Sequence, residues 1–217
     1  MPLTKTVFYT QDGLCLRQVT RYEWFAGGNT DLEEKQNRVK SLHNNFNLYR
    51  PDFKLLEISS ISPQPLGVQV SGLRLRDSKG NLIEGVYKGS IDYEGGQLED
   101  LYYVETAREA LTDKRGHELG LFSHYNLYGK RVPTEPITLM RYWLWCDAVY
   151  SQKNLLERVL EYNGFTTYFS RPSRDYFGTY PEAASLLVAL NTRGTVDEAM
   201  KNIESFALHA YGVEIQE

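Results

Sequence analysis

The sequence predicts a single α+β domain in which N-terminal β-hairpins and a central antiparallel sheet are packed by mainly C-terminal helices. Segments that alternate between apolar and polar side chains, as half-buried strands do, gather in the first half of the chain. Segments with helical periodicity dominate the second half, and this order is typical of the α+β class. The 217 residues, 41% of them hydrophobic, suffice for one core, and no repeat or linker divides residues 1–217.

The first two strands are expected to pair as a hairpin. Residues 3–10 alternate well enough for a strand, and Gln11-Asp12-Gly13 has the composition of a turn. Residues 15–22 then form the return strand.

A helix is expected over residues 31–45, with its cap at Asn29, Thr30 or Asp31. Helix-forming residues dominate this stretch, and side chains that recur at helical spacing share one face. They are Leu32, Gln36, Val39 and Leu42 or His43.

The middle of the chain is expected to add strands and turns. Residues 77–80, with the sequence DSKG, are a strong turn signal, and residues 63–67 and 89–96 are expected to be loops. A helix over residues 98–111 is less regular because of its tyrosines. Strands are expected at residues 54–60, 68–75 and 83–87.

The second half is expected to be mostly helical, with one strand at residues 165–169. Pro181 suits a first helical position, Thr195 with Glu198 resembles a capping box, and Gly164 is expected to end a helix. The expected helices span residues 136–150, 152–162, 181–191 and 196–210.

Composition limits the possible functions. With 24 basic and 28 acidic residues the net charge is −4, so any contact with a nucleic acid must be local. No apolar stretch approaches the roughly 20 residues of a membrane span, and no secretion signal is visible. Cys15 and Cys146 are therefore expected to be reduced thiols in a cytoplasmic protein.

The common catalytic motifs are missing from the sequence. The four histidines have no metal-ligand spacing, and there is no GxSxG elbow, GxxxxGK[ST] or GxGxxG motif. We therefore expect neither a metal nor a nucleotide cofactor. What remains is Trp24-Phe25 before two glycines, followed by Lys35 among carboxylates, where an aromatic could stack on a base and a lysine could act as nucleophile or charge clamp. The alternative interpretation is structural, with the tryptophan packing against the start of the helix.

Several segments, taken in order, resemble the NADAR family. They look like the branch found as antitoxins beside DarT-type DNA ADP-ribosyltransferases, and the likeness is clearest from residue 20 to 103. The segments are WFAGG at 24–28, KQNRVKSLH at 35–43, LEISS at 56–60, LGVQVS at 66–71, YKGSIDYEGG at 87–96 and EDLY at 99–102.

The resemblance implies an ADP-ribosyl N-glycosidase, a hydrolase that removes ADP-ribose from guanine in DNA. Other branches of the family act on small N-glycosides. The expected partners are an ADP-ribosylated nucleobase or nucleic acid as substrate and a cognate ADP-ribosyltransferase toxin, with no membrane.

The resemblance also implies roles for individual residues. Lys35 would attack the anomeric carbon as an amine of lowered pKa and hold the opened sugar as a Schiff base. Asp100 and Glu57 would stabilise the cationic sugar or direct a proton, with Glu94 as a weaker candidate. The expected ligand-binding residues are Trp24, Gly27, Gln36, Gly89, Ser90, Tyr93, Gly95, Gly96 and Arg174.

Two departures from the family pattern leave alternatives open. Ile91 stands where a lysine is expected, and residues 171–181 differ from the expected polar motif, although Arg174 could contact a phosphate. A degenerate binder of ADP-ribose or NAD-derived nucleotides is one alternative. A protein inhibitor of a neighbouring toxin, using some of the 16 tyrosines as anchors, is another.

Overall fold

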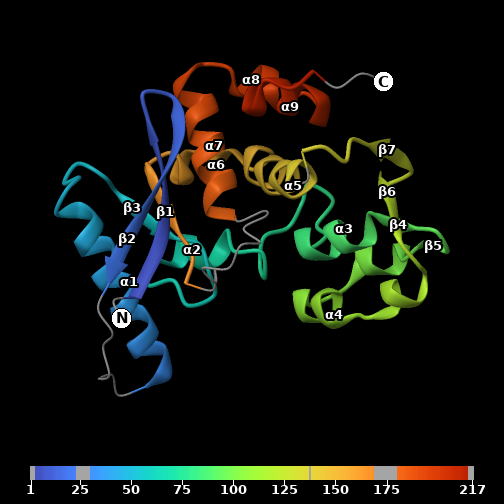
Figure 1. Cartoon of the computed structure of the whole chain (residues 1–217), viewed down its shortest axis with the longest axis horizontal. Coiled ribbons are helices and arrows are strands. Elements are labelled where there is room, and N and C mark those ends of the chain that lie inside the picture. The colour runs from blue at the N-terminus through green and yellow to red at the C-terminus, as the bar shows by residue number, and fades with distance from the viewer. Residues whose placement is uncertain (1–2, 23–29, 137, 169–179, 215–217) are drawn as a thin grey trace.

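A four-stranded sheet lies between two helices at one end of the molecule (Figure 1). The computed structural model describes residues 3–22, 30–136, 138–168 and 180–214. The strands run in the order β2-β1-β8-β3. Their bounds are β1 Leu3–Gln11, β2 Leu14–Tyr22, β3 Leu55–Glu57 and β8 Gly164–Thr166.

The predicted hairpin of β1 and β2 is confirmed, with a full antiparallel register from Leu3↔Tyr22 to Gln11↔Leu14. Asp12 and Gly13, with φ of 53° and 73°, form its tight turn. β3 instead pairs parallel to β8, so this sheet is mixed rather than antiparallel.

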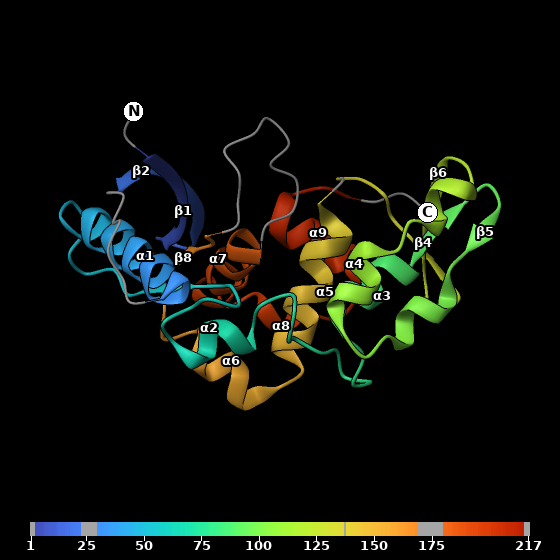
Figure 2. The same cartoon turned by 90° about the horizontal axis from the view of Figure 1, so that it is seen from below.

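Helix α1, Asp31–Asn47, covers one face of this sheet. Thr30 caps it by accepting a hydrogen bond from the backbone N–H of Glu33, as predicted. Val7 and Tyr9 of β1 pack against Leu42 and Phe46 of the helix. Helix α7, Tyr180–Thr192, packs against β1, β2 and β8 from the opposite face (Figure 2).

A second, antiparallel sheet lies at the other end of the long axis, in the order β5-β4-β6-β7 (Figures 1 and 2). Short helices pack beside it, with η1 and α4 against α3. The strands are β4 Ile91–Tyr93, β5 Gly96–Gln97, β6 Phe122–Leu127 and β7 Lys130–Val132. The helices are α3 Ile83–Gly89, η1 Glu99–Tyr103, α4 Ala107–Thr112 and η2 Arg115–Glu118.

Helix α5, Leu139–Tyr150, joins the two ends through the core. It packs against α3 on one side and α7 on the other, and the indole N–H of its buried Trp145 donates to the Val70 carbonyl at 2.8 Å. The remaining helices are α2 Pro65–Gln69, α6 Lys153–Val159, α8 Val196–Ala199 and α9 Ile203–Tyr211.

The α+β class is confirmed, but two predicted strands are wrong. Residues 68–75 do not form a strand, because Leu66 and Val70 are buried with the i, i+4 spacing of α2. Residues 83–87 belong to α3, where Ile83 and Val86 share the buried face that meets α5. In both cases tertiary packing outweighs a short alternating pattern.

Several boundaries also differ from the prediction. The helix expected over residues 98–111 divides into η1 and α4, and the one over 196–210 divides where Asn202 caps α9. Gly164 lies in β8 rather than at a helix end, and Thr195 makes no side-chain cap bond. The strands expected at 54–60 and 165–169 are shorter than predicted, as far as the structure describes them.

Candidate active site

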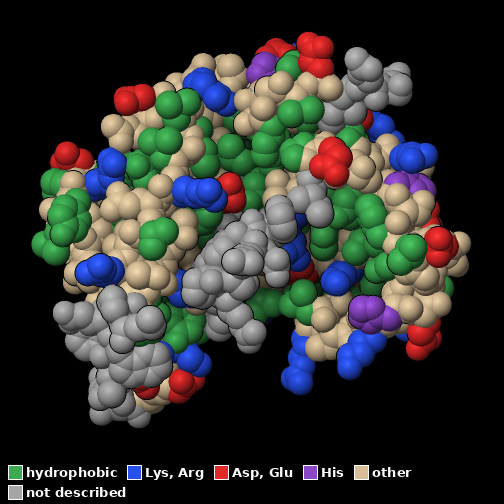
Figure 3. All heavy atoms as spheres, viewed as in Figure 1, with side chains coloured by type: hydrophobic (Ala, Val, Ile, Leu, Met, Phe, Trp, Pro, Cys, Tyr) green, Lys and Arg blue, Asp and Glu red, His purple; other side chains and the backbone are tan. Residues whose placement is uncertain are grey.

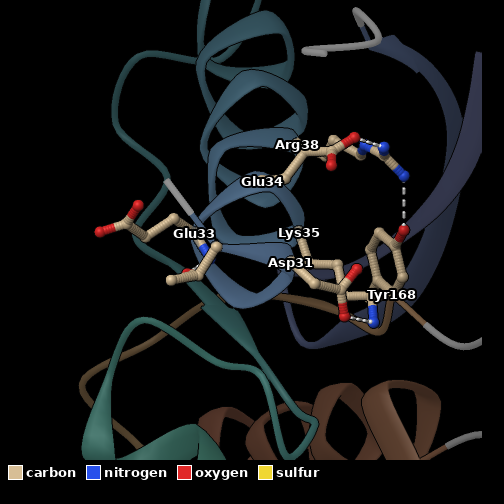
Figure 4. A network of polar contacts seen from close by, with 7 residues as sticks. Asp31, Glu33, Glu34, Lys35, Arg38 and Tyr168 are labelled. Atoms are coloured by element: carbon tan, nitrogen blue, oxygen red, sulfur yellow. Dashed lines mark hydrogen bonds and ion pairs between the residues drawn. The ribbon is translucent and has the colours of Figure 1, made fainter. Parts of the chain in front are cut away.

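Lys35 lies in the second turn of α1 and points along the same face as Asp31 (Figure 4). Its Nζ forms an ion pair with the Asp31 carboxylate one turn earlier, and 29% of its side chain is exposed. The hydrogen bond that Lys35 donates to Asp31 raises the pKa of Lys35 above its ordinary value. The expectation of a lowered pKa is therefore wrong for the free protein, in which Lys35 is an ammonium group.

Tyr168, just beyond β8, brings a second element to Lys35 (Figure 4). Its hydroxyl accepts a hydrogen bond from Nη1 of Arg38 at 2.8 Å. Arg38 is buried and also forms an ion pair with Glu34, so this helix face carries two ion pairs in succession. The phenol ring is thus held against the first turns of α1.

Glu57 ends β3 and is completely buried on the α1 side of the sheet. Thr166 donates its hydroxyl to Oε2 at 2.6 Å, and the backbone N–H of Tyr168 donates to Oε1 at 2.5 Å. Burial raises the pKa of Glu57, while Thr166, Ser59, the Tyr168 amide and Lys5 oppose this effect. Glu57 therefore fixes the segment that carries Tyr168.

Lys5 of β1 completes the support of this segment. Its Nζ donates to the Tyr168 carbonyl at 2.5 Å. Burial lowers the pKa of Lys5, and the Glu57 carboxylate partly offsets the effect. The lysine of this cluster with a lowered pKa is thus Lys5 and not Lys35.

His43 extends the buried network through Thr166, with 2.9 Å between its Nε2 and the hydroxyl oxygen. Burial lowers the pKa of His43 to about 4, so the ring is neutral at pH 7. Because Thr166 gives its only hydroxyl proton to Glu57, the hydroxyl must accept from His43, which assigns the proton to Nε2.

A cavity of about 290 Å³ adjoins this cluster. Ser59 and Ser60 line it just beyond Glu57, and Thr167 lines it immediately before Tyr168. Glu84 and Tyr180 form another part of its wall. On the outside, the surface is indented between the end that carries α1 and the end that carries α4 (Figure 3).

Among the expected catalytic residues, the structure gathers Lys35 and Glu57 around Tyr168 but leaves Asp100 elsewhere. Asp100 belongs to η1, which packs on α3 at the opposite end of the long axis, and its Oδ2 pairs with Arg115 at 2.6 Å. Gln36 follows Lys35 on α1 and is half-buried.

The residues of the glycine loop also lie at that opposite end and have local structural roles. The buried Ser90 hydroxyl donates to the Tyr87 carbonyl at 2.8 Å, and the Gly95 N–H donates to Leu119 at 2.8 Å, so neither is free for a diphosphate. Gly96 has φ of +108°, the positive value that a turn needs. A Cβ on Gly89 would lie 3.0 Å from the Tyr102 amide nitrogen.

Tyr93 and Glu94 complete that region. Tyr93 lines a separate cavity of about 140 Å³ with Lys88, Asp113 and His117. Glu94 accepts a hydrogen bond from the Leu121 amide at 3.2 Å. Trp24, Gly27 and Arg174 lie outside the described residues.

The residues that support Lys35 and Glu57 were not predicted from the sequence. A carboxylate directly after two buried leucines, Leu55-Leu56-Glu57, signals a buried charge that needs donors. That signal does not identify the donors Thr166 and Tyr168, which lie far from Glu57 in the sequence.

No group of three potential metal-ligating side chains occurs among the described residues. Within the same part of the chain, no helix has both the length and the apolar character needed to cross a membrane.

The sequence matches one known protein family. A family model described as DarT1-associated NADAR antitoxin matches residues 4–217, nearly the whole chain. No curated protein matches the sequence. The match confirms the resemblance seen in the sequence, and the chain belongs to the DarT1-associated NADAR antitoxin family.

Proposed function

We propose that this protein is an N-glycosidase that removes ADP-ribose from a nucleobase, most directly guanine in DNA, and so reverses the modification made by a DarT-type toxin. Membership of an antitoxin family supports the biological role. The observation that carries the chemistry is the partly exposed Lys35, which pairs with Asp31 and lies beside Tyr168, whose neighbour Thr167 lines a cavity.

The proposed reaction begins with a proton transfer from Lys35 to Asp31. The free amine then forms a bond to the anomeric carbon while the bond from that carbon to the base nitrogen breaks. The electron pair leaves with the base nitrogen, which takes up the proton held by Asp31. The sugar ring opens to a Schiff base, and water adds to it to release ADP-ribose and restore the amine.

Asp31 suits this role because its carboxylate already accepts a hydrogen bond from Lys35 and is largely exposed, where a substrate can reach it. The same hydrogen bond is the path by which Lys35 passes its proton to Asp31 and becomes a free amine. Glu57 is fully buried behind Tyr168, which supports a positioning role for it. Asp100 has no contact that supports a role in the same step.

A second function is favoured by one observation, the raised pKa of Lys35. An ammonium group held by Asp31 would clamp the diphosphate of ADP-ribose without attacking the sugar. The protein would then be a binder of ADP-ribose rather than a hydrolase.

Mass spectrometry of a guanine-ADP-ribosylated oligonucleotide tests the proposal. We expect wild type to remove the ADP-ribose mass and Lys35→Ala to leave it. Lys40→Ala, an exposed lysine on the same helix, is the matched control and should behave as wild type.

Borohydride reduction during turnover should trap an ADP-ribosyl adduct on the Lys35 peptide. Full hydrolysis by Lys35→Ala would refute the assignment of the nucleophile. An unchanged oligonucleotide with wild type, together with calorimetric binding of ADP-ribose, would support the binder instead.

A further inference from the structure

The cavity lined by Ser59 and Thr167 has both apolar and polar walls. Ile58 and Leu73 contribute apolar surface, and Ser59, Ser60 and Ser71 contribute small hydroxyl side chains. Glu84 is the one carboxylate among the described residues that line it. At about 290 Å³ the space is at the small end of ligand pockets, which span about 300–1,000 Å³, and suits one planar ring system rather than a whole dinucleotide.

Glu84 is held rigidly in this wall. Its exposed fraction is 5%, Tyr180 donates a hydrogen bond to Oε1 at 2.5 Å, and Arg141 donates to Oε2 at 3.0 Å. Burial and the neighbouring Glu84 raise the pKa of Tyr180 well above its ordinary value, so the phenol keeps the proton that it donates. Arg141 in turn lies over the ring of Tyr87, 4.5 Å from its centroid.

These contacts leave part of the carboxylate available. Each carboxylate oxygen can accept two hydrogen bonds, so Glu84 retains one acceptor site on each oxygen besides its bonds to Tyr180 and Arg141. Arg141 already balances the negative charge, so the site does not require a cation. A neutral group with two adjacent N–H donors matches two parallel acceptors.

Gly72 lets the backbone pack directly against Tyr180 and Glu84. A Cβ at this position would lie 2.8 Å from Oε1 of Glu84 and 2.3 Å from the Tyr180 ring. The absence of a side chain therefore brings the backbone of residues 71–73 close to the Tyr180–Glu84 pair without blocking it.

We propose that this cavity binds the nucleobase of the substrate and that Glu84 selects a base with two adjacent N–H donors, as on the Watson–Crick edge of guanine. Adenine offers one amino group beside an acceptor nitrogen, which would face a carboxylate oxygen and repel it. The proposal rests on the proposed function only in identifying this base as the one that Lys35 releases. Binding of the base itself is independent of cleavage.

Saturation-transfer NMR and titration with free nucleosides test the proposal on the full chain. We expect guanosine to bind about 10- to 100-fold more tightly than adenosine, because a bidentate base contact is worth about that factor. Inosine, which keeps the ring N–H but lacks the exocyclic amine, should fall between the two. Equal affinities, or a preference for adenosine, would overturn the proposal.

Two variants locate the selectivity. Glu84→Gln should remove most of the preference for guanosine over adenosine. Gly72→Ala should weaken the binding of both nucleosides, because its Cβ would displace the Tyr180 ring and the Glu84 carboxylate. Circular dichroism would show whether each variant folds, and the comparison of guanosine with adenosine on the wild-type protein tests the site without any substitution. Unchanged selectivity in folded Glu84→Gln, or unchanged affinities in Gly72→Ala, would contradict the assignment.

Lys35→Ala separates this inference from the proposed function. It should keep the guanosine preference while losing hydrolysis. If Lys35→Ala hydrolyses normally and the preference is present, the nucleophile is wrong and the base site stands. If wild type hydrolyses the substrate but has no nucleoside preference, the base site is wrong and the glycosidase stands.

Discussion

Replacing Thr166 with valine tests the buried network behind the candidate active site. Thr166→Val keeps the size of the side chain but removes both the donor to Glu57 and the acceptor of His43. A hydrogen bond to a charged group is worth about 1.5–3 kcal/mol, and a buried donor left without a partner costs about 1–3 kcal/mol. Because Thr166 and Glu57 are completely buried, no solvent screening reduces these values.

We therefore expect the free energy of unfolding to fall by about 2–4 kcal/mol at pH 7. For a chain of this length each kcal/mol corresponds to about 2–4 °C, so the melting temperature should fall by about 5–15 °C. Calorimetry with Thr166→Ser as control checks this, since serine keeps the hydroxyl and loses only a methyl group. A loss below about 0.5 kcal/mol in Thr166→Val, or an equal loss in both variants, would refute the reasoning.

The loss of stability in Thr166→Val should also increase with pH. Burial raises the pKa of Glu57 above its ordinary value, and the hydrogen bond from Thr166 opposes that rise. The raised pKa of Glu57 therefore stabilises the folded protein fully at pH values below the pKa of Glu57 in the unfolded chain. This contribution is lost as the pH rises through the higher pKa of Glu57 in the folded protein. Because Thr166→Val raises the folded pKa further, its deficit relative to wild type should be larger at pH 8 than at pH 5. A deficit that grows toward acid would contradict this sign.

Three other substitutions give distinct outcomes. Lys5→Met should lower the free energy of unfolding by about 1 kcal/mol, because it removes the hydrogen bond to the Tyr168 carbonyl and keeps the apolar part of the side chain. Urea titration measures this change. Asp100→Asn should hydrolyse the ADP-ribosylated oligonucleotide at the wild-type rate, in contrast to Lys35→Ala, and a loss comparable to Lys35→Ala would restore Asp100 to the active site. Trp145→Phe should cost about 2–4 kcal/mol in thermal unfolding, because it opens space in the core and leaves the Val70 carbonyl without its donor.

Local signals in the sequence predicted the N-terminal hairpin and the first helix well. The β1–β2 hairpin follows from alternation around a turn with positive φ at Asp12 and Gly13, and α1 follows from the Thr30 cap and a single buried face. These features depend on residues that are neighbours in the chain.

Features that depend on distant residues were not predictable in the same way. β3 consists of three residues and finds its place only by pairing with β8, which lies 109 residues later. Residues 83–87 are helical because Ile83 and Val86 face α5, which nothing in their own alternation indicates.

The candidate site was also predicted only in part. Lys35 and Glu57 were found through a resemblance to family motifs, and the structure brings both to Tyr168. The same resemblance grouped Asp100 and the glycine loop with them, although these residues pack around α3 at the other end. Motif order along the chain does not report distance in space.

The support of Tyr168 has a consequence for the order in which activity appears during synthesis. Lys5 and Arg38 emerge early, but the segment that they hold is separated from them by 163 and 130 residues. A chain broken before residue 164 keeps Lys35 and Asp31 yet lacks both the Tyr168 ring that lies beside them and strand β8, whose Thr166 donates to Glu57. A ribosome that stalls in the first three quarters of the message would therefore release an antitoxin chain without its candidate active site.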